Sequence, residues 1–160
     1  MCKHLNTVLC RYYMETSLTI DVGILQFIRK IRSMAYSVFQ ELGRGYSESV
    51  YQRALCVELQ IARIEYDIEI PIVIPYKGHT VGQVRADIIV RSSCPIILET
   101  KVNRFFRHEE RCQLTRYMKL LGIDVGILIN FGERVQTQII VGCDNDYYVY
   151  TMKNGIGTLI

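Results

Sequence analysis

The sequence predicts an α/β (α+β) fold, in which a mixed central β-sheet is flanked by α-helices. Two stretches with helical periodicity come first, three strand-like runs follow, and a further helical stretch precedes the remaining strand-like runs. Elements in this order form a mixed sheet with helices packed on it. The chain has 160 residues and 49% hydrophobic content, which is enough for one sizeable core and favours a single domain.

The first 22 residues carry no clear period, and we predict that they form an N-terminal extension to a domain that covers residues 23–160. A helix is predicted next, because apolar residues recur at intervals of four and three: Ile24, Ile28, Ile31, Ala35, Val38 and Leu42. Gly43 follows at the position where helices commonly end. A second helix is expected to begin at Ser47, a good N-cap residue, and to run to about Ile64.

The strand predictions rest on runs of β-branched and aromatic residues that are bounded by turn residues. These runs are "IEIPIVIPY" (68–76), "VGQVRADIIV" (81–90), "IILETKV" (96–102), "DVGILINF" (124–131) and a terminal hairpin of "TQIIVGC" (137–143) and "DYYVYTM" (146–152). The turn Lys77-Gly78-His79 joins the first two runs. Residues 104–122 are predicted to be helical, with Gly122 as the end of the helix.

Composition narrows the class of protein. No apolar run reaches about 18 residues, so neither a membrane span nor a membrane partner is expected. The six cysteines include no C-x-x-C pair and no histidine at zinc spacing, which favours reduced thiols in an intracellular protein of the cytoplasm, the nucleus or a virion. The formal net charge of +3 permits a polyanionic partner without requiring one.

Three charged residues stand inside strand-like runs, where leaving water is costly unless the charge is paired or metal-bound. Glu99 and Lys101 project from the same face of their strand, because side chains alternate. If the preceding strand pairs with theirs, Asp87 lies beside Glu99, and a cation between the two carboxylates relieves their repulsion. Oxygen ligands of this kind suit Mg²⁺ or Mn²⁺. The alternative is an ordinary Lys–Glu ion pair on a solvated sheet face.

Two polar residues fall on the apolar faces of the predicted helices. Glu48 leads the buried face of the second helix, although a first-turn glutamate also serves simply to compensate the helix dipole. Gln113 lies near the middle of an apolar stripe that includes Tyr117, and a buried amide must find partners. These partners are either a site residue on the facing strand or ordinary backbone.

Basic residues gather at the start of the third predicted helix and around Glu48. They are Arg104, Arg107, His108 and Arg111, together with Arg44 and Arg53. On a helical wheel the three arginines 104, 107 and 111 lie opposite Gln113. They are either a solvated face or contacts for the phosphates of a nucleic acid.

Taken together, these motifs resemble the GxxExxY protein family of the PD-(D/E)-x-K nuclease superfamily over about residues 24–150. The residues that carry the resemblance are Gly45–Tyr51 for the naming motif, Asp87 in "VRADIIV", Glu99 and Lys101 in "IILETKV", Gln113 and Tyr117 for Gln-x-x-x-Tyr, and Gly126–Gly132 for "GILINFG". The resemblance implies a restriction-endonuclease-like mixed central β-sheet flanked by α-helices. The residues before Asp87 depart from a literal Pro-Asp, and the tail "KNGIGTLI" falls outside the pattern.

The resemblance also implies a site and an activity. Its catalytic residues are Glu48, Asp87, Glu99, Lys101, Gln113 and Tyr117, and its metal ligands are Asp87, Glu99, Glu48 and Thr100. Lys101 would serve the attacking water or the scissile phosphate. The implied function is metal-dependent hydrolysis of nucleic-acid phosphodiester bonds, with Mg²⁺ or Mn²⁺ as cofactor and DNA as the favoured substrate. The alternative is a nucleic-acid-binding or structural protein that keeps a nuclease fold without turnover, and a homodimer is left open.

Overall fold

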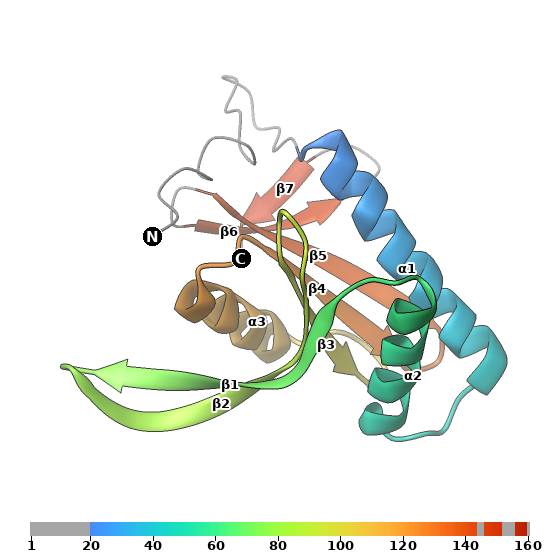
Figure 1. The fold of residues 1–160 in the computed structure, drawn as a ribbon, viewed down its shortest axis with the longest axis horizontal. Coiled ribbons are helices and arrows are strands. Elements are labelled where there is room, and N and C mark those ends of the chain that lie inside the picture. Colours follow the sequence, from blue (N-terminus) through green and yellow to red (C-terminus); the bar gives the residue numbers. More distant parts are fainter. Residues whose placement is uncertain (1–19, 144–145, 152–155, 160) are drawn as a thin grey trace.

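The computed structural model describes residues 20–143, 146–151 and 156–159, and its elements follow one another as shown in Figure 1. The helices are α1 (Val22–Leu42), α2 (Glu48–Ile61) and α3 (His108–Leu121). The strands are β1 (Tyr66–Tyr76), β2 (His79–Val90), β3 (Ile96–Lys101), β4 (Val125–Phe131), β5 (Val135–Cys143), β6 (Asp146–Thr151) and β7 (Ile156–Leu159). The fold is therefore the mixed α+β arrangement that the sequence predicts.

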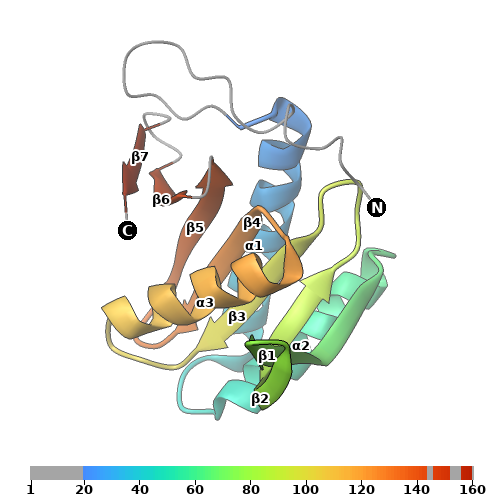
Figure 2. The same cartoon turned by 90° about the vertical axis from the view of Figure 1, so that its left-hand side faces the viewer.

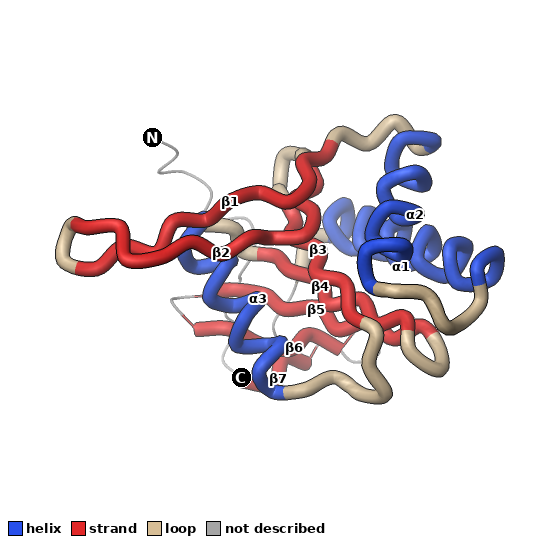
Figure 3. The backbone as a smooth tube through the Cα atoms, turned by 90° about the horizontal axis from the view of Figure 1, so that it is seen from below, coloured by secondary structure: helices blue, strands red, loops and turns tan. Residues whose placement is uncertain are grey.

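The strands form one sheet in chain order from β1 to β7. Only β3 and β4 pair in parallel, and α3 is the crossover between them, while every other neighbouring pair is antiparallel. Parallel strands need such a long connection, whereas antiparallel strands can be joined by tight turns. The β1–β2 hairpin is longer than its neighbours and projects from the body of the molecule (Figures 1 and 3).

Helices cover both faces of the sheet. The helices α1 and α2 pack on one face with residues such as Leu98 and Ile127, and α3 packs on the other with Ile97 and Leu128 (Figure 2). Gly126 accommodates the close approach of α3: a Cβ atom there would lie 2.8 Å from Met118 Sδ, and this buried side chain would have to shift. The strand β3 is consequently buried on both sides, and its charged residues are inside the protein rather than on an open sheet face.

The ends of the helices differ from the sequence predictions at several points. The helix α1 begins where Asp21 Oδ1 accepts from the backbone N–H of Gly23, and it ends at Gly43 as expected. The helix α2 is shorter than predicted, and Ser47 occupies its N-cap position without a side-chain cap hydrogen bond. The helix α3 begins at His108 rather than at 104, because residues 103–107 are held in a loop. The strand β7, in the tail outside the family pattern, was not predicted.

The boundary between an extension and the domain stays a prediction, because residues 1–19 lie outside the described part of the chain. Ile20 already packs in the core against the face of the sheet that α1 covers. Within the described residues, no helix is long and apolar enough to cross a membrane. Cys56, Cys94 and Cys112 are free, whereas Cys143 is disulfide-bonded, so the expectation of reduced thiols is wrong for Cys143.

Candidate active site

The strands β2 and β3 part at Asp87. Their last paired residues are Ile88 and Leu98. Beyond this pair, hydrogen bonds to the carboxylate of Asp87 take the place of backbone hydrogen bonds between the two strands. Asp87 Oδ2 accepts hydrogen bonds from the Thr100 backbone N–H at 2.8 Å and from Thr100 Oγ1 at 2.7 Å. On the other side, Gln52 Nε2 of α2 donates to the Asp87 carbonyl oxygen at 3.1 Å. The carboxylate is therefore fixed at the point where the sheet opens.

The alternation of side chains between the two faces of β2 is also interrupted at Asp87. Ala86 and Ile89 both pack in the core beside α3, whereas Ile88 and Val90 pack on the opposite side of the sheet. Simple alternation would place Ala86 and Ile88 on one face. The pairing of β1 with β2 keeps its register on both sides of Asp87, so the side chains change face here without an inserted residue, at the point where β2 and β3 cease to pair.

Lys101 lies between two glutamates at the end of β3. Its Nζ is 2.8 Å from Glu99 Oε1 and 3.6 Å from Glu48 Oε1, which comes from the first residue of α2. The Glu99 side chain is 2% exposed and that of Lys101 is 12% exposed. The ammonium group is thus the cation that offsets this buried acid.

The negative charges of Glu48, Asp87 and Glu99 repel one another even with Lys101 present. Burial, followed by repulsion from Asp87, raises the pKa of Glu99 to about 7, although Lys101 opposes both effects. Burial and the same repulsion raise the pKa of Glu48. Burial acts to lower the pKa of Lys101, but Glu99, Glu48 and Asp87 outweigh it and leave that pKa raised, so the lysine is a cation at neutral pH. The site holds more negative charge than one ammonium group neutralises.

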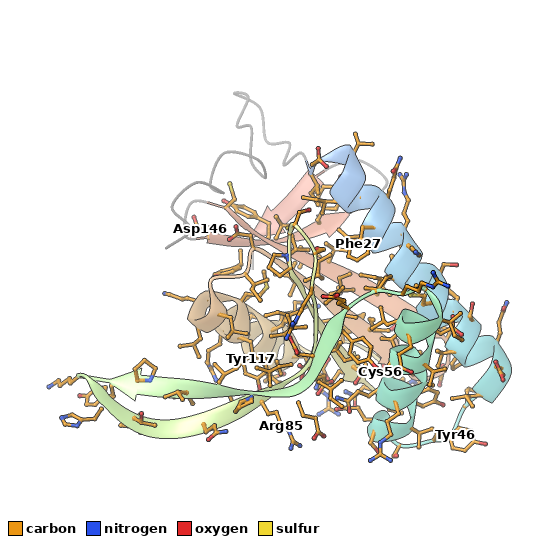
Figure 4. All side chains as sticks on the ribbon, in the orientation of Figure 1. Phe27, Tyr46, Cys56, Arg85, Tyr117 and Asp146 are labelled. Atoms are coloured by element: carbon orange, nitrogen blue, oxygen red, sulfur yellow. The ribbon has the colours of Figure 1, made fainter. Side chains whose placement is uncertain are left out.

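The helix α3 holds Glu99 from the other side of the sheet. Gln113 Nε2 lies 3.1 Å from Glu99 Oε1 and 2.8 Å from the Tyr117 hydroxyl oxygen, which accepts its hydrogen bond. Tyr117 is buried on the face of α3 that turns toward the sheet (Figure 4). The amide is therefore bonded to the predicted strand residue, and not to the ordinary backbone that was the alternative.

Tyr51 of the predicted Gly-x-x-Glu-x-x-Tyr motif does not touch the acids. Its hydroxyl donates to the Gly43 carbonyl oxygen at 2.7 Å, and its ring stacks on Phe131 with centroids 4.6 Å apart. Tyr51 thereby joins the end of α1 and the end of β4 to the start of α2. This arrangement sets where the α2 N-terminus, and with it Glu48, lies relative to β3.

Sequence reasoning missed a buried polar cluster behind Lys101. Asn130 Oδ1 accepts from the Asn103 backbone N–H and Asn130 Nδ2 donates to the Asn103 carbonyl oxygen, both at 2.8 Å. Glu110 Oε1 accepts from Asn103 Nδ2 at 2.5 Å, and Glu110 Oε2 accepts from the Arg107 backbone N–H. Gly132 is required beside them, because a Cβ atom there would lie 2.0 Å from the Asn103 carbonyl oxygen. An asparagine inside the otherwise apolar run of β4 was the available signal.

The predicted basic residues are only partly brought together. Arg44 and Arg104 line one cavity, and Arg111 lines a neighbouring one, where its Nε donates to Gln138 Oε1 at 2.9 Å. Arg53 is exposed on α2, and Arg107 is the exposed N-cap residue of α3; neither lines these cavities. Because α3 begins at His108, the helical wheel does not describe Arg104 and Arg107.

A divalent cation fits this chemistry through two carboxylates. Glu99 Oε2 is buried without a hydrogen-bond partner, and Glu99 is repelled by Asp87. A cation between the two would supply both the missing partner and the missing charge. Mg²⁺ commonly uses one or two carboxylates and keeps several waters. Within the described ranges, no three Asp, Glu, His or Cys side chains are grouped as a ligand set, so the roles of Glu48 and Thr100 as ligands stay predictions.

Comparison with known families agrees with the fold and with the arrangement of these residues. The sequence profile of the PD-(D/E)XK nuclease superfamily matches residues 25–141. The chain belongs to this superfamily. The match spans α1 to β5 and includes every residue of the site described above. Nuclease action on nucleic acid is therefore the class of function that the family supports.

Two solved structures resemble the chain at low identity. The crystal structure of SSO0001 is 22% identical with a TM-score of 0.48, and the similarity covers 71% of this chain and 63% of that one. The Holliday junction resolvase Hjc from the archaeal hyperthermophile Archaeoglobus fulgidus is 16% identical with a TM-score of 0.39, over 58% of this chain and 75% of Hjc. No curated protein matches the chain.

Proposed function

We propose that the protein is a metal-dependent nuclease of the GxxExxY type that hydrolyses phosphodiester bonds, with DNA as its substrate. The observation that carries the proposal is Glu99, a buried acid with one partnerless oxygen beside Asp87. If the Lys101–Glu99 pair were purely structural, it would not need the carboxylate of Asp87 beside it. Strongly perturbed acids with a specific charged partner are typical of catalytic sites.

In the proposed mechanism, Asp87 and Glu99 would hold a Mg²⁺ or Mn²⁺ ion. When bound, such an ion polarises a phosphate oxygen and lowers the pKa of a bound water. Thr100 contributes by fixing the carboxylate of Asp87 through its N–H and hydroxyl groups. Gln113 orients the carboxylate of Glu99, and Tyr117 orients Gln113.

Lys101 acts on the phosphate in this proposal. It is protonated at neutral pH, since its neighbouring acids raise its pKa. A positive group that is fixed in a water-poor site stabilises the extra charge of the pentacovalent transition state more than a solvated one does. Glu48, together with Glu99, positions the Lys101 ammonium group at the end of β3.

The test is cleavage of single-stranded DNA, double-stranded DNA and RNA by purified protein with Mg²⁺, Mn²⁺ or EDTA. The informative variant is Asp87→Asn, which keeps an oxygen for the Thr100 hydrogen bonds but removes the charge. Its matched control is Asp67→Asn, an exposed aspartate of β1 that is paired with Arg91. We expect Asp87→Asn to lower the metal-dependent rate by at least about 10²-fold, because it weakens the hold on the metal.

Three outcomes contradict the proposal in different ways. Absence of metal-dependent cleavage on every substrate favours the alternative of a binding or structural protein without turnover. Cleavage that survives Asp87→Asn at the wild-type rate points to a contaminating nuclease. Cleavage of RNA alone would keep the nuclease and correct the substrate.

A further inference from the structure

Two neighbouring cavities share Phe105, Arg134 and Gln136 as lining residues. Their volumes are about 280 Å³ and about 570 Å³. We call them together the arginine cavity, because five arginines line it: Arg32, Arg44, Arg104, Arg111 and Arg134. Figure 3 shows the loop between β3 and α3, which carries Arg104 and Phe105, beside the turn between β4 and β5, which carries Arg134.

The charge of the arginine cavity fits a polyanion. Glu133 is the one acid among its lining residues, and its Oε1 lies 3.8 Å from Arg104 Nε. This contact is between exposed side chains, and solvent screens such pairs strongly. Arg111 Nε already donates to Gln138 Oε1, whereas Arg44 and Arg134 line the smaller cavity with planar guanidinium groups, which bind phosphates in a bidentate manner.

The cavity also carries an exposed aromatic ring. Phe105 is 63% exposed, and it is the one aromatic residue among the three that line both cavities. The Arg104 guanidinium carbon lies 5.5 Å from the centre of this ring. An aromatic ring flanked by arginines is the arrangement on which single-stranded nucleic acids stack their bases.

The loop that presents Phe105 is fixed at both ends. Asn103 is bonded to Asn130 of β4 and to Glu110 of α3, and Arg107 is bonded to Glu110 through its backbone. Phe105 is four positions after Lys101 in the chain, so their Cα atoms are at most about 14 Å apart. A strand whose scissile phosphate lies at Lys101 therefore reaches the arginine cavity within a few nucleotides.

We propose that the arginine cavity binds an unpaired nucleotide segment that flanks the scissile phosphate. A base stacks on Phe105, and the adjoining phosphates lie against Arg104, Arg44 and Arg134. Bases inside a duplex are stacked on each other and offer no free face to Phe105, whereas phosphates are present in any nucleic acid. The preferred substrate is consequently DNA with a single-stranded overhang next to the cut. This inference rests on the proposed nuclease function.

The test measures binding in EDTA, where the proposed metal-dependent cleavage cannot occur. Labelled duplexes with a short overhang at either end, and the matched blunt duplex, are titrated with wild type and with Phe105→Ala. We expect an overhang to improve wild-type affinity by about fivefold or more, and Phe105→Ala to abolish this gain without changing blunt-duplex affinity. Arg134→Gln is expected to weaken both duplexes and to flatten the dependence of affinity on salt.

The matched control is Tyr76→Ala at the tip of the β1–β2 hairpin. Tyr76 is 60% exposed, and Lys77 Nζ lies 5.4 Å from its ring centre, so its local chemistry resembles that of Phe105 and Arg104. We expect Tyr76→Ala to keep the overhang preference. Equal affinity of wild type for blunt and overhang duplexes, or equal losses in the two variants, overturns the inference. An overhang preference without metal-dependent cleavage would instead overturn only the proposed function.

Discussion

Two Glu–basic pairs on neighbouring parts of the sheet have opposite surroundings. On the hairpin, Arg85 Nη1 lies 3.6 Å from Glu69 Oε2, with side chains that are 64% and 52% exposed. At the end of β3, Lys101 Nζ lies 2.8 Å from Glu99 Oε1, with both side chains largely buried. Figure 4 shows Arg85 on the side of the hairpin away from α3, whereas Glu99 is bonded to α3 through Gln113.

The difference distinguishes an ion pair that is exposed to solvent from one whose charges have lost their solvation by water. Water screens the hairpin pair, which adds little to stability. The buried pair keeps a carboxylate whose pKa is raised to about 7 and one of whose oxygens has no partner. Replacing a buried ion pair with apolar residues is often neutral or stabilising, so its presence here favours a chemical role over a structural one.

The largest effect is expected from removing the buried cation. Lys101→Met should lower the rate of metal-dependent cleavage by about 10²–10³-fold while changing nucleic-acid affinity only a few-fold, because the charge acts mainly on the transition state. Single-turnover cleavage and binding in EDTA measure the two quantities. The control is Arg85→Met, which removes the exposed cation and should leave both unchanged. If the two variants lost activity equally, the proposed distinction between the pairs would be wrong.

A smaller effect is expected from the pH dependence of stability in EDTA. The pKa of Glu99 is about 7 in the folded protein and near 4.5 in the unfolded chain, so between these values the folded state binds more protons. The unfolding free energy of the wild type should therefore fall as pH rises through this window, relative to Glu99→Gln. Between pH 5 and pH 8 the relative change should be on the order of 2 kcal/mol in favour of Glu99→Gln.

Urea unfolding of both proteins at several pH values measures this change. A constant difference between the two proteins across the window would show that Glu99 is ionised throughout. That result would contradict the raised pKa that burial gives to Glu99.

The smallest effect is expected at the hairpin pair itself. A double-mutant cycle with Arg85→Ala and Glu69→Ala should give an interaction energy of about 0–1 kcal/mol, and added salt should reduce it further. Chemical denaturation at low and high salt provides the four free energies. A coupling of several kcal/mol that resists salt would mean that the exposed pair is not screened as its surroundings imply.

The sequence predicted those features that follow from periodicity. Alternation along β3 placed Glu99 and Lys101 on one face, and the apolar stripe of α3 placed Gln113 toward it. It could not predict that α3 begins at His108, because the preceding loop is held by the contact of Asn103 with Asn130, 27 residues further along the chain. The interruption at Asp87 was also hidden, since it depends on how β2 packs against both layers.

The sequence also could not predict which arginines lie together. A helical wheel grouped Arg104, Arg107 and Arg111, yet two of them precede the helix. The partners that do share a cavity with Arg104 are Arg44 and Arg134, which follow α1 and β4 respectively. Tertiary packing alone brings these segments together, and no local pattern encodes it.

The hydrogen bond from Gln52 to the Asp87 carbonyl oxygen has a consequence for the order of folding. It joins residues 35 positions apart, whereas β1 and β2 are joined by a two-residue turn. Contacts between distant residues carry a larger loop-closure cost and tend to form later than local ones. The hairpin can therefore form early, while Asp87 is secured only when α2 docks. In a refolding experiment, the proposed cleavage activity would then return after most of the β-strand signal, and its return would report the completion of folding.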